Sequence, residues 1–120
     1  MVLVDTSVWI EHLKRSLPHL SSLLGEGLVL CHEFVMGELA CGNLKNREEI
    51  LQLLEDLPQA LMAQKDEVLT LIHSHRLYGK GIGWVDAHLL AATKISHAKI
   101  WTLDKKLKIL SHTLGMSYDE

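Results

Sequence analysis

The sequence has 120 residues, of which 48% are hydrophobic and 22% charged, with eight glycines and two prolines. This balance excludes a disordered or collagen-like chain and predicts one domain, spanning residues 1–120, that is large enough to bury its own core. The net charge of −3 argues against a protein that holds nucleic acid by bulk positive charge alone.

The N-terminal half alternates short apolar strands with helices. In chain order the pattern predicts a strand over residues 2–4, a helix capped by Thr6 or Ser7, a short helix with Pro18 near its start that Gly25 and Gly27 terminate, a strand over 28–31, and a helix that includes Glu38 and stops near Gly42. Asn46 and Glu49 have the spacing of a capping box, which predicts a further helix with Leu53 and Leu54 facing inward.

The C-terminal half continues this alternation. The expected elements are a strand over 59–64, helices over 66–78 and 84–97, a strand over 99–103, a helix over 105–112 and a short fifth strand near 116–118. Strands that alternate with helices predict a parallel sheet covered on both faces, and ligands of such sheets bind beyond the carboxyl ends of the strands.

Four acidic residues occupy positions that can meet at that edge. Asp5 and Asp104 directly follow predicted strands, while Glu38 and Asp86 lie in helices. Each stands among apolar neighbours, whereas acids such as Glu48 stand among polar residues. Taken singly, each of the four also fits a helix cap, a helix-dipole partner or a solvated side chain, so it is the set that indicates a site.

Clustered carboxylates need a counter-charge. Two like charges 4 Å apart repel by about 4 kcal/mol at an effective dielectric constant of 20. A carboxylate set without thiolate or imidazole ligands selects Mg²⁺ or Mn²⁺, and these ions support phosphodiester hydrolysis. The sequence therefore favours a metal-dependent enzyme that acts on phosphate esters.

Four segments, 3–10, 36–42, 83–90 and 102–104, resemble PIN-domain proteins, and the chain is most similar to VapC-type ribonuclease toxins of toxin–antitoxin pairs. The resemblance implies a three-layer α/β/α sandwich with a parallel sheet of four or five strands in the order 3-2-1-4-5. It also implies a metal-dependent endoribonuclease that cleaves RNA to 5′-phosphate and 3′-hydroxyl ends. A small antitoxin protein and a second copy of the chain, forming a homodimer, are the partners it implies.

By this resemblance, Asp5, Glu38, Asp86 and Asp104 are the catalytic acids that hold Mg²⁺ or Mn²⁺. The hydroxyl residues Ser7 and Thr102 match supporting positions, and Thr6 stands beside them. Lys106 stands where many relatives have a further acid. Lys106 and its neighbour Lys105 are thus candidate contacts to a substrate phosphate, with solvated lysines as the alternative.

Several residues keep two interpretations. Cys31 and Cys41 fit free thiols, and together with a start that lacks the basic region of a signal peptide they predict a cytoplasmic protein with no membrane contact. His32 lies nearest the expected crevice. Trp9 and Trp84 fit core packing, base stacking or a partner interface, while Trp101 fits the core.

Three other functions remain as alternatives. A catalytically silent PIN-like module that binds RNA or acts as a scaffold would retain the fold without cleaving. A phosphoaspartate receiver needs a pair of acids after the first strand, but Asp5 stands alone there. A haloacid-dehalogenase-like phosphatase needs an acid at Ser7.

Overall fold

The computed structural model describes residues 1–119. Its elements in chain order are β1 (Val2–Val4), α1 (Thr6–Arg15), α2 (Pro18–Gly25), β2 (Val29–Leu30), α3 (Glu33–Ala40), α4 (Arg47–Asp56), α5 (Lys65–Ser74), α6 (Trp84–Ile95), β3 (Lys99–Trp101) and α7 (Lys105–Thr113). The predicted α/β alternation is therefore present, and the helices end within four residues of the predicted boundaries.

The sheet is parallel, with the strand order β2-β1-β3. Val2 pairs with Val29 on one side and with Lys99 on the other, so β1 is the central strand. All three residues of β1 are buried, as expected for a strand covered on both faces. This arrangement brings the residues that follow β1 and β3 to the same edge of the sheet.

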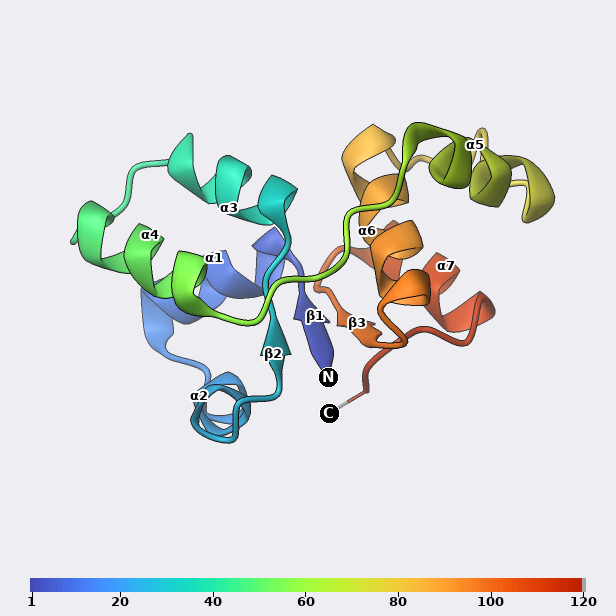
Figure 1. Ribbon diagram of the computed structural model, residues 1–120. Coiled ribbons are helices and arrows are strands. Elements are labelled where there is room, and N and C mark those ends of the chain that lie inside the picture. Colours follow the sequence, from blue (N-terminus) through green and yellow to red (C-terminus); the bar gives the residue numbers. More distant parts are fainter. Residues whose placement is uncertain (120) are drawn as a thin grey trace.

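The expected count of four or five strands is not confirmed. Within residues 1–119, the third and fifth predicted strands are reduced to isolated bridges, Cys31 with Gln59 and Ile100 with Ser117. After Gln59 the chain leaves the sheet, and the Leu61 N–H donates to Ser96 Oγ at the end of α6 (3.0 Å). Figure 1 shows this segment crossing from α4 toward α5.

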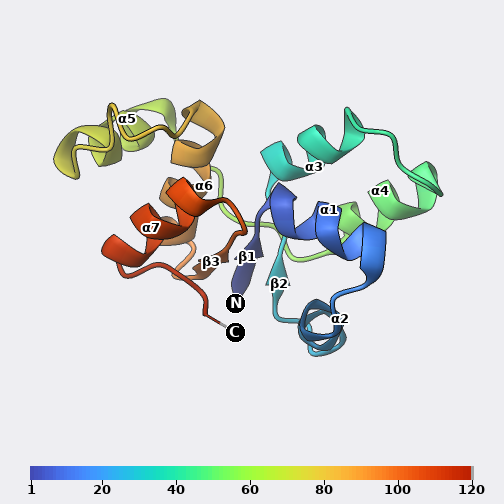
Figure 2. The ribbon, with the colours of Figure 1, turned by 180° about the vertical axis from the view of Figure 1, so that it is seen from behind.

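Helices lie on both faces of the sheet. In Figure 1, α4 and α6 stand nearer the viewer than α1 and α7, and in Figure 2 this order is reversed. The core between the layers includes the β1 side chains and large residues fully buried by the helices, among them Leu20, Leu54, Leu89 and Leu107. No helix in residues 1–119 is long and apolar enough to cross a membrane.

The expected details of α4 are wrong in two respects. Leu54 is buried, but Leu53 is 56% exposed because it lies off the buried stripe that Leu54 occupies. Asn46 has a left-handed backbone (φ 53°), so its side chain makes no capping bond. A reciprocal cap occurs instead at α5, where the Gln64 N–H donates to Glu67 Oε1 at 2.8 Å.

Candidate active site

Asp5 follows β1 directly and is buried, with 6% of its surface exposed. It occupies the N-cap position of α1, yet its carboxylate makes no capping bond. Instead Oδ2 accepts hydrogen bonds from Ser7 Oγ (2.8 Å) and from Thr102 Oγ1 (2.6 Å). Two hydroxyl donors on one oxygen stabilise a charged carboxylate and fix its direction. The Asp5 carboxylate is therefore oriented by Ser7 and Thr102 and does not cap the helix.

Asp104 reaches the same network through the backbone that follows β3. Its N–H donates to Thr102 Oγ1 (3.1 Å), and the Leu103 N–H donates to Ser7 Oγ (3.0 Å). The Asp104 side chain is exposed, and its Oδ1 caps α7 by accepting from the Leu107 N–H at 2.9 Å. Thr102 thus joins the two strand-end acids, one as its acceptor and one as its donor.

Glu38 and Asp86 approach from helices on different parts of the chain. Glu38, on α3, is exposed, and its Oε1 accepts a hydrogen bond from Thr6 Oγ1 at 2.6 Å. Asp86, in the first turn of α6, is half-buried, and its Oδ2 accepts a long bond from the Gly83 N–H at 3.4 Å. The hydroxyl residues Thr6, Ser7 and Thr102 therefore each contact one or more members of the set.

The four carboxylates interact electrostatically. Burial raises the pKa of Asp86 above its ordinary value, and the negative charges of Asp5, Asp104 and Glu38 raise it further, while the bond from the Gly83 N–H lowers it. In residues 1–119, no Lys or Arg forms an ion pair with any of the four; the ion pair present is Arg15–Glu11. Their negative charge is therefore left without a basic partner.

The donor set fits a hard divalent cation, because four carboxylates lie within electrostatic reach of one another and lack a basic partner. Among the described residues, however, no three His, Cys, Asp or Glu side chains stand close enough to hold a metal ion in their present rotamers.

Lys106 lies against the loop that precedes α6. A Cβ placed on Gly81, whose φ is +84°, would stand 2.7 Å from Lys106 Cδ and 2.8 Å from Nζ, so a side chain at this position would displace the end of the lysine. Lys105 is exposed. Two other basic residues are engaged elsewhere: Arg15 pairs with Glu11, and Lys99 Nζ donates to the Gly115 carbonyl.

His32 has a structural position. Its Nδ1 accepts the Phe34 N–H at 2.9 Å and so caps α3, the helix that carries Glu38. Burial lowers the pKa of His32 to about 4, with a smaller contribution from His88, so the ring is neutral at neutral pH. The pattern "strand, then His" gave no sign of this cap, because Ser, Thr, Asp and Asn are the residues that usually cap helices.

The three tryptophans differ in solvent exposure. Trp9 and Trp101 are each 5% exposed and belong to the core, whereas Trp84 is 45% exposed at the start of α6. Core packing is therefore the correct interpretation for Trp9 and Trp101 and the wrong one for Trp84. Nothing in the local sequence distinguished Trp9 from Trp84, since both stand in amphipathic helices.

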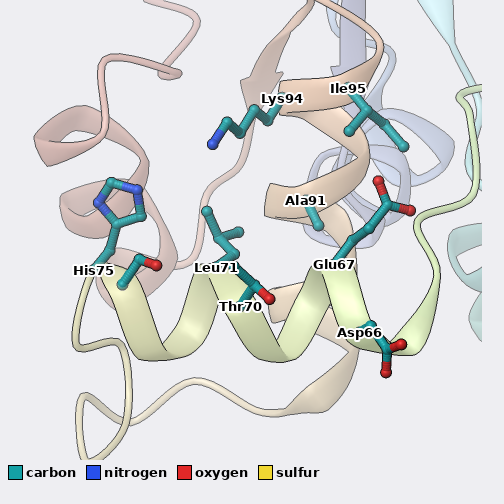
Figure 3. A pocket seen from close by; sticks show the side chains of 9 residues that line it. Asp66, Glu67, Thr70, Leu71, His75, Ala91, Lys94 and Ile95 are labelled. Carbon is teal, nitrogen blue, oxygen red and sulfur yellow. The ribbon is translucent and has the colours of Figure 1, made fainter.

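A pocket of about 390 Å³ lies elsewhere, between α5 and α6 (Figure 3). Its lining includes Glu67, Thr70, His75 and Lys94 and none of the four acids. Of the four acids, Glu38 and Asp104 are exposed, Asp86 is half-buried and Asp5 is buried. The pocket between α5 and α6 therefore plays no part in the acid site.

Comparison with known proteins identifies the family. Residues 2–112 match the PIN domain family. The chain is 45% identical over 121 residues to Ribonuclease VapC32 of Mycobacterium tuberculosis, in strain CDC 1551 / Oshkosh and in strain ATCC 25618 / H37Rv. Each alignment covers 100% of this chain and 98% of the relative. The resemblance drawn from the four sequence segments is confirmed, and the chain belongs to the PIN-domain family.

Proposed function

We propose that this protein is an endoribonuclease of VapC type that hydrolyses RNA phosphodiester bonds and depends on Mg²⁺ or Mn²⁺. One observation carries the proposal: Asp5 and Asp104, at the ends of adjacent strands, are joined through Thr102, and their charges act on Asp86. The relatives at 45% identity are named as ribonucleases, which supports RNA as the substrate.

Asp5, Glu38, Asp86 and Asp104 would hold the cation. When bound, Mg²⁺ or Mn²⁺ neutralises the carboxylates and stabilises negative charge on the phosphate during hydrolysis. Because a bound cation would balance the negative charge of the phosphate, the net charge of −3 is no obstacle to an RNA substrate.

The chain's own residues supply orientation. Ser7 and Thr102 engage Asp5 Oδ2, so Oδ1, which has no hydrogen-bond partner in residues 1–119, is the oxygen left to face the crevice. Lys106, whose side chain lies beside Gly81, would contact a phosphate next to the cleaved one. A water that adds to phosphorus, gives up a proton and expels the 3′ oxygen, which takes up a proton, leaves a 5′-phosphate and a 3′-hydroxyl. The 2′-hydroxyl is then not the nucleophile, and no histidine is needed to activate it.

The test is an RNA cleavage assay with end mapping, run on the wild type, Asp5→Asn and Glu48→Gln. Glu48 is an exposed acid on α4 and serves as the matched control for loss of one negative charge. We expect Asp5→Asn to fold normally and lose cleavage, Glu48→Gln to cleave normally, and EDTA to silence the wild type until Mg²⁺ or Mn²⁺ is added. Cleavage by Asp5→Asn at the wild-type rate would refute the assignment. RNA binding without metal-dependent cleavage would instead identify a silent binding module.

The same proposal includes a toxin role in the cytoplasm, with a small antitoxin protein as partner and a homodimer as the working form. The antitoxin would place a basic side chain near the four acids, which lack one of their own in residues 1–119. Expression of the chain should arrest growth, and co-expression of the product of the adjacent gene should relieve the arrest. Light scattering of the purified protein would test the dimer.

A further inference from the structure

Four aromatic side chains from the starts of α3 and α6 form a continuous row, here called the aromatic row: His32, Phe34, His88 and Trp84. Successive ring centroids are 5.2, 4.8 and 4.7 Å apart, and the interplanar angles of 64°, 67° and 86° make each contact edge-to-face. Such pairs are favourable aromatic geometries. The indole of Trp84 therefore has one face of its surroundings defined by an edge-to-face contact with His88.

The outer end of the row is open to solvent. Trp84 is 45% exposed, while His32 is fully buried and His88 nearly so. The residue before it is Gly83, where an added Cβ would meet no atom within 4 Å. An exposed indole beside open space is the arrangement in which another flat ring can stack.

The open indole stands at the same end of α6 as Asp86. Both residues belong to the first turn of α6, and Asp86 is near enough to Asp5, Glu38 and Asp104 for their charges to act on it. Residues two apart on a helix point to different faces, so Trp84 would meet a nucleotide that flanks the phosphate at the acids.

The ammonium group of Lys106 lies near the loop that precedes α6. Lys106 packs against Gly81, three residues before Trp84, and makes no ion pair with a carboxylate in the described part of the chain. An indole that can stack and an ammonium group that can meet a phosphate together match the two halves of a nucleotide. A protein partner would instead favour a wider apolar surface around its aromatic anchor, and here both Gly81 and Gly83 lack side chains.

We propose that Trp84 stacks on a base of the RNA next to the cleaved phosphate. This inference rests on the proposed ribonuclease function, and it adds a contact that selects how the strand lies across the four acids. Since every base has a flat face, the contact strengthens binding without selecting one base strongly.

The test measures RNA binding apart from cleavage, with the full chain carrying Asp5→Asn and a fluorescently labelled mixed-sequence oligoribonucleotide. Base–aromatic stacking is worth about 1–3 kcal/mol, so Trp84→Leu should weaken binding by about 5- to 150-fold, while Trp84→Phe should restore most of the loss. Leu53→Ala changes another exposed apolar residue, on α4; it is the control and should bind as tightly as the parent. In chains with Asp5 intact, Trp84→Leu should raise KM and lower kcat much less.

The outcomes separate this inference from the proposed function. If wild-type protein cleaves RNA but Trp84→Leu binds and cleaves as the parent does, the stacking contact is refuted and the nuclease survives. If Trp84→Leu retains its RNA affinity and loses only the complex with the product of the adjacent gene, Trp84 belongs to a protein interface and the inference is overturned. If no RNA is cleaved but Trp84→Leu still weakens binding, stacking is supported and the nuclease assignment fails.

Discussion

Replacing Thr102 with valine tests the hydroxyl network most directly. Thr102 is 3% exposed, and valine has nearly its shape, so the change removes a hydroxyl without opening a cavity. Asp5 Oδ2 loses a 2.6 Å bond, and the Asp104 N–H loses its acceptor. A hydrogen bond to a charged group contributes about 1.5–3 kcal/mol, so the free energy of unfolding should fall by about 2–3 kcal/mol.

We expect Thr102→Val to lower RNA cleavage by weakening metal binding. Groups that orient metal ligands typically contribute 10- to 100-fold in metal affinity or activity. We therefore expect Thr102→Val to need about 10- to 100-fold more Mn²⁺ for half-maximal RNA cleavage, measured by titration beside urea unfolding monitored by circular dichroism. Thr102→Ser is the matched control, since it keeps both hydrogen bonds and loses one methyl group.

The comparison between Thr102→Val and Thr102→Ser tests whether the Thr102 hydroxyl orients Asp5. Thr102→Ser should be destabilised by about 1 kcal/mol and should keep the wild-type metal dependence. If Thr102→Val and Thr102→Ser had the same stability and the same metal dependence, the hydroxyl would be irrelevant to Asp5. The network would then be a by-product of strand packing.

Three further predictions follow from single residues. Because the pKa of His32 is about 4 when folded and 6.5 otherwise, the unfolded chain binds the proton first as the pH falls, so about 3 kcal/mol of stability present above pH 6.5 should be lost by pH 4. His32→Asn, which retains a capping acceptor, should flatten that part of a pH series of urea unfolding curves. Gly81→Ala should displace Lys106 and weaken RNA binding as Lys106→Met does, whereas Gly79→Ala, with φ +70° and open space, should affect only stability. Because the pKa of Asp86 is raised in the folded state, its contribution to stability is present below pH 3.8 and is lost as the pH rises through the folded pKa. Asp86→Asn should therefore raise the thermal midpoint at pH 7 while abolishing cleavage. A lowered midpoint would contradict the repulsion among the acids.

The strand-end acids could be predicted because their signal is local. An apolar run followed by Asp places that Asp at the carboxyl end of a strand, and the parallel topology then brings Asp5 and Asp104 to one edge. The role of Thr102 could not be derived in this way. Its hydroxyl matters because β1 and β3 pair in a register that brings Val4 opposite Trp101 and so sets Thr102 beside Asp5, 97 positions apart in sequence.

Other errors arose where tertiary contacts overrode local pattern. Residues 59–64 were expected as a strand, but beyond Gln59 the backbone bonds to Ser96 and crosses to α5. Asn46 has the right chemistry for a cap and the wrong backbone conformation. Burial of Trp9 and exposure of Trp84 depend on which helix face the sheet covers, and single-helix periodicity does not contain that information.

The site explains why its residues should respond to mutation with opposite signs. Asp86 carries charge that its neighbours oppose, so neutralising it relieves repulsion and should stabilise the fold. Ser7 and Thr102 offset the cost of burying Asp5, so removing either hydroxyl should destabilise it. Cleavage should fall in both cases, because the acids act on the substrate and the hydroxyls act through an acid. Variants of ordinary core residues lose stability and activity together. A variant that gains stability and loses activity, beside one that loses both, would distinguish a functional carboxylate site from ordinary packing.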